Sequence, residues 1–237
     1  MPERFSASRV ERFIQCHASA NLDLAIEGWV PPVQDPNKDN AANRGSHIHE
    51  VFAEAMSFNP KNLRKFSEAI AYIADLRDRR RFSVLIEEPM TAEWLPTRPG
   101  TTADLVLYVA DEMHIVDLKT GKIPVSAVDN AQLLFYAATY GVLSPKAKGV
   151  HLHIVQPWAD VMEHWFADVS VIAQFMNDAA IAEAAIQAGS TQFSPGDNCL
   201  FCPANPHGRG LKGQPLCPVM MELLYPRLID EDEILGG

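Results

Sequence analysis

The chain has 237 residues, 47% of them hydrophobic, which is enough for one large domain or for one domain with a small appendage. Its formal net charge of −10 excludes non-specific binding of nucleic acid by the surface as a whole, because nucleic acids are polyanions, and leaves room only for a local basic groove. No apolar stretch approaches the roughly 20 residues that span a bilayer, so we expect a soluble, cytoplasmic protein without membrane contact.

The first predicted element is a short helix that begins near Ser8. Ser8 and Glu11 have the Ser-x-x-Glu spacing of a capping box, and apolar residues follow at helical intervals. Cys16 falls near the end of this helix. A loop rich in Pro, Asn and Asp over residues 30–43 leads to a second helix, predicted over residues 44–58. The chain therefore opens with helices.

The rest of the chain is predicted to alternate between strands and helices. After a helical pattern over residues 62–80, the periodicity changes to that of strands, which we predict over residues 82–95, 101–109, 112–120 and 149–158. Short loops join the first three strands, which favours an antiparallel meander. The remaining predicted helices cover residues 126–143 and 169–189, the second of which is rich in Ala and closed by Gly189.

Asp117 and Lys119 are two residues apart in a predicted strand, so their side chains share one face with Cα atoms about 6.6 Å apart. The ordinary interpretation of such a pair is an ion pair on a solvated strand edge. Asp104 changes this interpretation, because it lies in the middle one of the first three predicted strands, and a short turn to the strand of Asp117 brings both carboxylates to one site. Paired carboxylates suit Mg²⁺, and a lysine beside them can orient a water or stabilise a pentacovalent phosphate. The pattern favours phosphodiester hydrolysis.

The four cysteines are Cys16, Cys199, Cys202 and Cys217. Without a secretion signal, disulfides are a poor interpretation of them. The Cys199-x-x-Cys202 spacing is that of a metal knuckle, and the residue types allow a zinc site, a four-iron cluster or four unrelated buried thiols. A zinc ribbon would bring a second close pair, which the single Cys16 and Cys217 do not supply.

Four motifs in sequence order give the chain a resemblance to a known family. They are Gly45-x-x-x-His49, Asp104, Asp117-Leu118-Lys119 and Gln132-x-x-x-Tyr136. Together they resemble the PD-(D/E)XK nucleases, specifically the RecB-type branch that includes CRISPR adaptation nucleases and phage-encoded relatives. The spacing from Gly45 selects His49 over His47, whereas helical periodicity does not choose between these histidines.

The resemblance implies a role for each matched residue. The implied ligands of Mg²⁺ or Mn²⁺ are His49, Asp104, Asp117 and the carbonyl of Leu118. The implied catalytic residues are Asp104, Asp117, Lys119, Gln132 and Tyr136. Among them, Lys119 would act on the attacking water, and Gln132 with Tyr136 would steady the site or the DNA strand. The implied ligands of a [4Fe-4S] cluster, with Zn²⁺ as the alternative, are Cys16, Cys199, Cys202 and Cys217.

The expected fold is α/β, with a restriction-endonuclease-like core of a mixed sheet flanked by helices and a C-terminal cysteine-cluster segment. The expected divisions are an N-terminal helical segment over residues 1–44, a nuclease core over 45–190 and a cluster segment over 191–237. The expected function is metal-dependent hydrolysis of DNA, as an exonuclease on ends or single strands in phage or bacterial recombination or repair. Recombination proteins or further copies of the chain are expected partners. The alternatives are a nucleic-acid-binding subunit of a recombination complex and a zinc-stabilised interaction protein.

Overall fold

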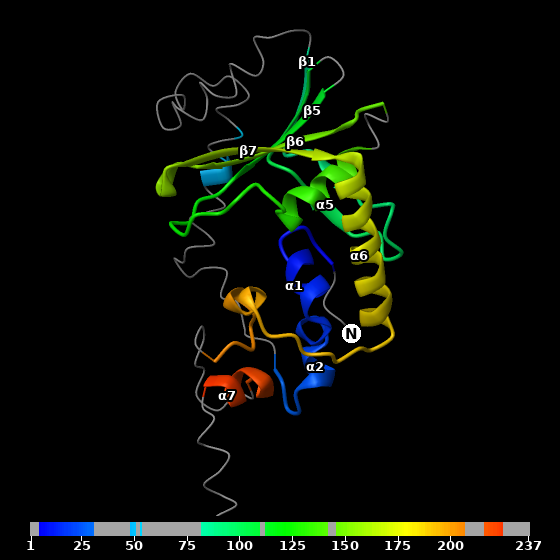
Figure 1. The fold of residues 1–237 in the computed structure, drawn as a ribbon, viewed down its shortest axis with the longest axis vertical. Coiled ribbons are helices and arrows are strands. Elements are labelled where there is room, and N and C mark those ends of the chain that lie inside the picture. The colour runs from blue at the N-terminus through cyan, green and yellow to red at the C-terminus, as the bar shows by residue number, and fades with distance from the viewer. Residues whose placement is uncertain are drawn as a thin grey trace, which may run out of the picture. The chain divides into compact units, whose positions relative to one another are not determined.

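The computed structural model of the chain describes residues 5–30, 48–50, 53, 82–109, 112–141, 146–206 and 216–224 (Figure 1). The chain divides into two compact units. One unit is Asp35–Asn177, and the other is formed by Met1–Gln34 with Asp178–Gly237. The helix predicted over residues 62–80, most of the one predicted over 44–58, and the motif residues Gly45 and His47 lie outside the described residues.

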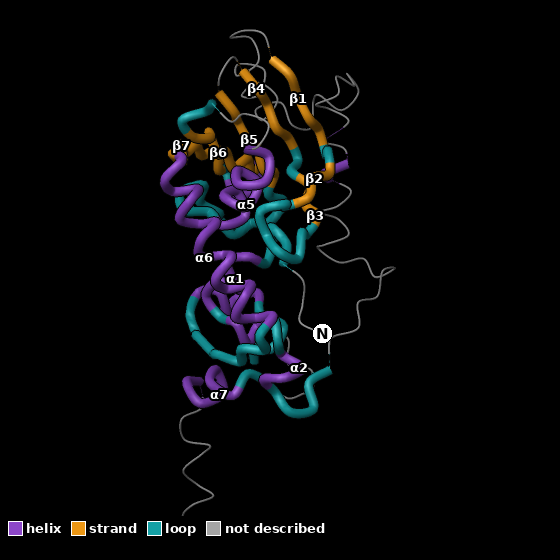
Figure 2. Tube along the Cα trace, turned by 90° about the vertical axis from the view of Figure 1, so that its right-hand side faces the viewer, coloured by secondary structure: helices purple, strands orange, loops and turns teal. Residues whose placement is uncertain are grey.

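A five-stranded mixed sheet forms the centre of the unit Asp35–Asn177 (Figure 2). Its strands, in spatial order, are β1 (Phe82–Ile86), β4 (Leu105–Val109), β5 (Glu112–Leu118), β6 (Gly149–Gln156) and β7 (Val161–Asp168). The β5–β6 pair is parallel and the other pairs are antiparallel. Two short strands, β2 (Pro89–Thr91) and β3 (Gly100–Thr102), pair separately between β1 and β4 along the chain. The predicted α/β fold with a mixed sheet is confirmed.

Burial explains why the strands have different sequences. β5 is buried at six consecutive positions, Met113–Leu118, as expected for a central strand that is covered on both faces. β7 is an edge strand whose exposure alternates along its length. The sequence analysis missed β7, because Glu163 and His164 interrupt its apolar residues. Asp104 was predicted within one strand over residues 101–109, but this segment divides into β3 and β4, and Asp104 lies immediately before β4.

Helix α5 (Ala131–Tyr140) packs on one face of the sheet. Asn130 is its N-cap and accepts a hydrogen bond from the Leu133 N–H at 3.1 Å. Trp94 lies beside Phe135 of α5 and Phe175 of α6 (Val169–Gln187), with ring centroids 5.4 and 6.1 Å apart. These aromatic contacts fix the helix that carries the predicted Gln132 and Tyr136.

Besides the C-terminal part of α6, the other unit is built from short helices. They are α1 (Val10–Gln15), the 3₁₀ helix η1 (His17–Ser19), α2 (Leu22–Ala25), the 3₁₀ helix η5 (Asp197–Phe201) and α7 (Pro218–Leu224). The predicted capping box is wrong, because α1 is preceded by Arg9 as N-cap and has no side-chain cap. The buried amide of Asn21 donates to the carbonyls of Ile186 and Ser190 at 3.0 and 2.9 Å, which ties the α2 region to the end of α6.

Helix α6 corrects the expectation that no apolar stretch approaches the length of a membrane span. It has 19 residues with a mean hydropathy of 1.3, so by length and composition alone it could cross a bilayer. The core helix of a globular protein passes the same test. The buried residues of α6 recur at helical spacing, as expected for a helix with one packed face, and are Ile172, Phe175, Ala179, Ala182, Glu183 and Ile186.

A glycine in β6 provides a test of the close packing between β6 and β7. We predict that Gly149→Ala lowers the free energy of unfolding by about 1–3 kcal/mol, because its Cβ would lie 2.4 Å from the Ala167 carbonyl oxygen and the backbone would have to shift. Gly100→Ala is the control, because nothing lies within 4 Å of the Cβ there. Denaturant titration of both variants measures the difference, and equal midpoints would contradict this packing.

Candidate functional site

Asp104 joins the end of β5 to a histidine from a distant part of the chain. Its Oδ1 lies 2.9 Å from Nδ1 of His49, and its Oδ2 accepts a hydrogen bond from the Leu118 N–H at 2.6 Å. This bond to Asp104 raises the pKa of His49, because the carboxylate favours the charged imidazole. The backbone contact of Leu118 with Asp104 is therefore made by its N–H, and a metal-binding role for its carbonyl stays a prediction.

Tyr140 holds the backbone next to Asp104. Its hydroxyl accepts from the Ala103 N–H at 3.1 Å and donates to the Glu88 carbonyl at 2.5 Å. The side chain is fully buried. Tyr140 lies one helical turn beyond Tyr136 on α5, so it presents its ring on the same side of the helix. Sequence analysis missed this positioning residue, although the four-residue spacing from Tyr136 was a usable signal.

Glu87 is a second carboxylate that sequence analysis missed. One ligand atom from each of His49, Glu87 and Asp104 lies within 4.8 Å of the others. Burial, followed by the charge of Asp104, raises the pKa of Glu87. Its φ of 49° is in the left-handed region, which is uncommon for a residue with a side chain and is often found at functional sites. The sequence carried no signal for Glu87, because it falls inside the single strand predicted over residues 82–95.

Asp117 and Lys119 lie at the end of β5 and contact each other. Lys119 Nζ is 2.9 Å from Asp117 Oδ2, and the side chain of Asp117 is only 3% exposed. Burial raises the pKa of Asp117 to about 6, although the positive charge of Lys119 counteracts part of this effect. The pair therefore differs from an ion pair on a solvated strand edge, because its carboxylate is withdrawn from water.

Gln132 connects this pair to Tyr136. Its Oε1 accepts from Lys119 Nζ at 2.5 Å, and its Nε2 donates to Asp117 Oδ1 at 3.1 Å and to the Tyr136 hydroxyl at 2.8 Å. Burial raises the pKa of Tyr136 well above its ordinary range, so the hydroxyl stays neutral. One amide thus orients both members of the acid–base pair from the first turn of α5.

Gln156 holds the segment that follows Lys119. Its Nε2 donates to the carbonyls of Gly121 and Ile123 at 2.9 and 2.8 Å, and its Oε1 accepts from the Val125 N–H at 3.0 Å. The side chain is fully buried at the end of β6. Sequence analysis missed Gln156, because a glutamine near a strand end carries no signal of the loop that it binds.

The donor types in this site suit a hard divalent cation. Carboxylate oxygens from Glu87, Asp104 and Asp117 are the preferred ligands of Mg²⁺ and Mn²⁺, and an imidazole such as that of His49 is also acceptable to Mn²⁺. Asp104 and Asp117 are buried, which is costly for carboxylates without a compensating charge. Among the described residues, the arrangement fits a cation site with a lysine at its side.

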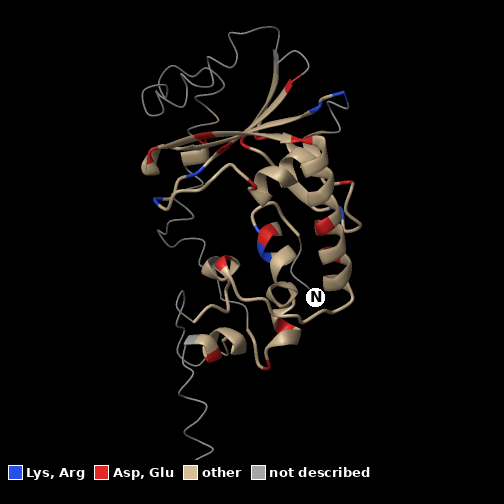
Figure 3. Cartoon of the chain, in the orientation of Figure 1, with Lys and Arg blue, Asp and Glu red and all other residues tan. Residues whose placement is uncertain are grey.

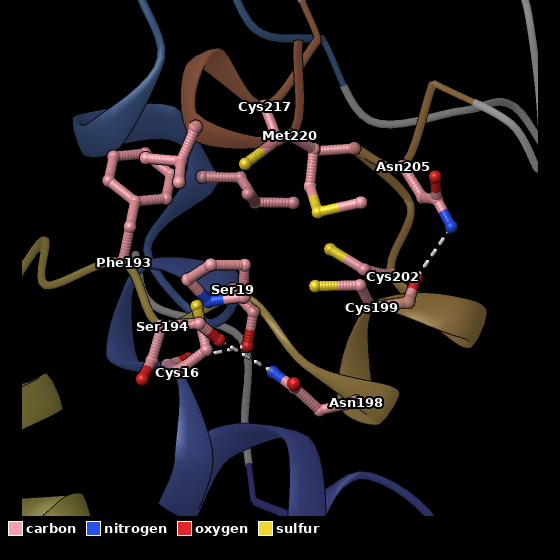
Figure 4. A pocket seen from close by; sticks show the side chains of 14 residues that line it. Cys16, Ser19, Phe193, Ser194, Asn198, Cys199, Cys202, Asn205, Cys217 and Met220 are labelled. Atoms are coloured by element: carbon pink, nitrogen blue, oxygen red, sulfur yellow. Dashed lines mark hydrogen bonds between the residues drawn. The ribbon is translucent and has the colours of Figure 1, made fainter. Parts of the chain in front are cut away.

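The four cysteines line one pocket of the unit formed by Met1–Gln34 and Asp178–Gly237 (Figure 4). Cys16 follows α1, Cys199 and Cys202 belong to η5 and its end, and Cys217 precedes α7. Segments that are distant in sequence thus bring all four sulfurs to one place. Leu22, Phe193 and Met220 complete an apolar lining.

The surroundings of the four cysteines fit a negatively charged thiolate centre. Burial raises the pKa of the Cys202 and Cys217 thiols, so they need a positive charge to become ligands. The buried Arg12 guanidinium lies beside Cys202 and supplies one such charge. The Gly196 N–H donates to Cys199 Sγ at 3.4 Å, a type of bond that tunes metal-bound sulfur.

Comparison with known proteins matches most of the chain to one family. Residues 64–236 match DUF2800, a family whose description is "Protein of unknown function". The structure is similar to that of SSO0001, at 12% identity and a TM-score of 0.41, over 89% of this chain and 85% of that chain. It is also similar to a protein from Eubacterium rectale named "Putative exonuclease", at 15% identity and a TM-score of 0.48, over 93% and 92% of the two chains.

Gln156 gives a prediction for the segment beside Lys119. We expect Gln156→Leu to lower the free energy of unfolding by about 3 kcal/mol, because three hydrogen bonds from this buried side chain to Gly121, Ile123 and Val125 are lost together. Gln187→Leu, at an exposed position of α6, is the control and should change the stability by less than about 0.5 kcal/mol. Equal unfolding midpoints in the two variants would show that Gln156 does not anchor this segment.

Proposed function

This chain belongs to the DUF2800 family, a family of unknown function, and we propose that it is a metal-dependent nuclease that hydrolyses DNA. The observation that carries the proposal is the buried Asp117–Lys119 pair held by Gln132, next to a second carboxylate, Asp104, that is held by Leu118 and His49. Phosphodiester hydrolysis needs this combination of charges. The carboxylates would bind a cation that holds the negatively charged phosphate, and the lysine would stabilise the negative charge that develops in the transition state.

His49, Glu87, Asp104 and Asp117 would hold Mg²⁺ or Mn²⁺ in this function, and the Leu118 carbonyl is a further proposed ligand. A cation bound there supplies polarisation of a phosphate oxygen and stabilisation of the developing charge. Glu87 is added to the sequence-based ligand set because its carboxylate lies in one group with His49 and Asp104.

Lys119 serves the reaction through its ammonium group. Its contacts with Asp117 and Gln132 hold Nζ at one position, so the amine does not need to be ordered when the substrate arrives. From this position it orients the attacking water and donates to the charge that builds up on the phosphate. Gln132 and Tyr136 are the residues that keep this geometry.

The proposed substrate is DNA at an end or in single-stranded form, in bacterial or phage recombination or repair. The motifs that resemble RecB-type nucleases support this part of the proposal. In the part of the chain that the structure describes, Lys and Arg are scattered over separate elements (Figure 3). A partner protein or another copy of the chain is therefore proposed to help hold the polyanion.

The cysteine pocket is proposed to hold a [4Fe-4S] cluster, with Zn²⁺ as the alternative metal. Four thiolates are the ligand set of such a cluster, and Cys16, Cys199, Cys202 and Cys217 line one pocket. The buried charge of Arg12 supports a centre of net negative charge. Because this centre joins segments from both ends of the chain, its role is proposed to be structural.

A nuclease assay with the purified chain tests the function. Duplexes with free ends, duplexes with blocked ends and single strands are incubated with Mn²⁺, with Mg²⁺ and with EDTA. Metal-dependent cleavage of the free-ended or single-stranded substrates alone is the expected result. Cleavage of blocked duplexes would indicate an endonuclease, and DNA binding without cleavage would favour a non-catalytic subunit.

We predict that Lys119→Ala abolishes detectable cleavage, which corresponds to a decrease in kcat of at least about 100-fold. DNA affinity should change little, because the ammonium acts mainly on the transition state. Lys122→Ala removes a charge from an exposed position three residues away and is the matched control. Single-turnover cleavage and fluorescence anisotropy measure the two properties. Full activity of Lys119→Ala would exclude the proposed role of this lysine.

We also predict that protein purified without oxygen is brown and contains iron and sulfide in similar amounts. Cys16→Ala should lose this colour and become prone to aggregate, because the centre no longer closes the loop between the two ends of the chain. Asp117→Asn is the control, which should keep the colour and lose cleavage. A colourless wild-type protein with bound zinc would replace the iron-sulfur assignment, and a brown, soluble Cys16→Ala protein would remove Cys16 from the ligand set.

A further inference from the structure

Four histidines gather on the sheet face opposite the Asp117–Lys119 pair. His114 is three residues before Asp117 in β5, and alternation along the strand puts their side chains on opposite faces. Strand register places His114 opposite His151 of β6, and His153 of β6 opposite His164 of β7. All four imidazoles therefore share one face across three neighbouring strands.

The four rings form two hydrogen-bonded pairs. Nδ1 of His114 lies 3.1 Å from Nε2 of His153, and Nδ1 of His151 lies 2.8 Å from Nε2 of His164. Each contact requires one ring to donate a hydrogen and the other to accept it, which couples the tautomers of the two rings. The rings of His114 and His151 are stacked, with centroids 4.5 Å apart. These contacts make the cluster an ordered group.

Two of the rings, those of His151 and His153, lie in surroundings that favour the uncharged form. Burial, together with the neighbouring His114, lowers the pKa of His153 to about 2. Burial and His164 lower the pKa of His151 as well. Protonation would place like charges beside one another, which is unfavourable at these distances. Neutral imidazole is the form that binds metal ions.

Glu112 completes a ligand set with two of the histidines. One ligand atom from each of Glu112, His114 and His151 lies within 4.8 Å of the others. Nε2 of His114 is 3.8 Å from Oε2 of Glu112. Ligands about 2.0–2.2 Å from a tetrahedral zinc ion are roughly 3.3–3.6 Å apart, so this pair has to close by about 0.2–0.5 Å and the other pairs by at most about 1.5 Å. The exposed Glu112 side chain has room for such a movement.

The remaining histidines occupy the positions of supporting residues. His153 and His164 each contact the Nδ1 atom of a ligand histidine, and Nε2 of His114 faces the Glu112 carboxylate. A partner on the second ring nitrogen is the usual way in which a metal-binding histidine is oriented. The Phe166 ring packs against His151 with centroids 4.9 Å apart and further restricts its rotation.

We propose that Glu112, His114 and His151 form a binding site for a divalent transition-metal ion of the Zn²⁺ class. Two imidazoles and one carboxylate suit Zn²⁺, whereas Mg²⁺ prefers a site made only of oxygen ligands. Three protein ligands leave a position for water or another group. The ion links the parallel strands β5 and β6 on the face opposite the proposed nuclease site, so this site is separate from that function.

Calorimetric titration of the full-length chain with Zn²⁺, in the presence of excess Mg²⁺, tests the proposal. Glu112→Gln and His151→Gln are expected to remove one Zn²⁺ equivalent or weaken its binding by at least about 10-fold. His164→Gln keeps all three ligands and is expected to weaken binding by about 10-fold through lost orientation. Glu112 is exposed, so Glu112→Gln is a variant that should fold normally.

Matched variants separate this site from the other proposed centres. Asp160→Asn removes one negative charge, as Glu112→Gln does, but at an exposed position of the β6–β7 connection. His17→Gln removes an imidazole from the other unit. Both should bind Zn²⁺ as the wild type does. Asp117→Asn, which alters the proposed nuclease site, should also keep the histidine-dependent equivalent. Unchanged Zn²⁺ binding in either Glu112→Gln or His151→Gln would overturn the proposed ligand set.

Discussion

The hydrogen bond from the Leu118 N–H to the Asp104 carboxylate is the contact on which the proposed site depends. It joins the start of β4 to the end of β5 and draws an acid into the protein, where charge is costly. Asp104 can occupy this position because His49 pairs with its other oxygen and Tyr140 holds the preceding backbone. Without these partners, the buried carboxylate would lose the hydrogen bonds that offset the cost of its burial.

The second half of the site follows the same principle with a different partner. Asp117 is withdrawn from water and its charge is balanced by Lys119, and both are held by the amide of Gln132. An amide can do this because it donates from one end and accepts at the other. Helix α5 therefore has two functions, since its apolar residues pack on the sheet and its Gln132 and Tyr residues organise the polar contacts. Stability and site geometry depend on the same helix.

The two faces of the central sheet carry different chemistry. On one face, carboxylates and a lysine form a site rich in oxygen ligands, whereas the other face presents ordered imidazoles with one carboxylate. The β-strand period of two makes this possible, because neighbouring residues of β5 such as Val116 and Asp117 point to opposite faces. The cysteine pocket is a third set of donors, with sulfur in place of oxygen or nitrogen. The three proposed ligand sets suit different metal ions.

Local spacing in the sequence was sufficient to predict the α/β class, the shared face of Asp117 and Lys119, and the helix that carries Gln132 and Tyr136. These features depend on strand and helix periods that span only a few residues. Only the tertiary structure revealed the edge strand β7, the pairing of the histidines and the contributions of Glu87, Tyr140 and Gln156. Each depends on contacts between segments many residues apart, and strand register and helix packing decide those contacts. The sequence determined which donor groups the protein has, and the fold determined which of them meet.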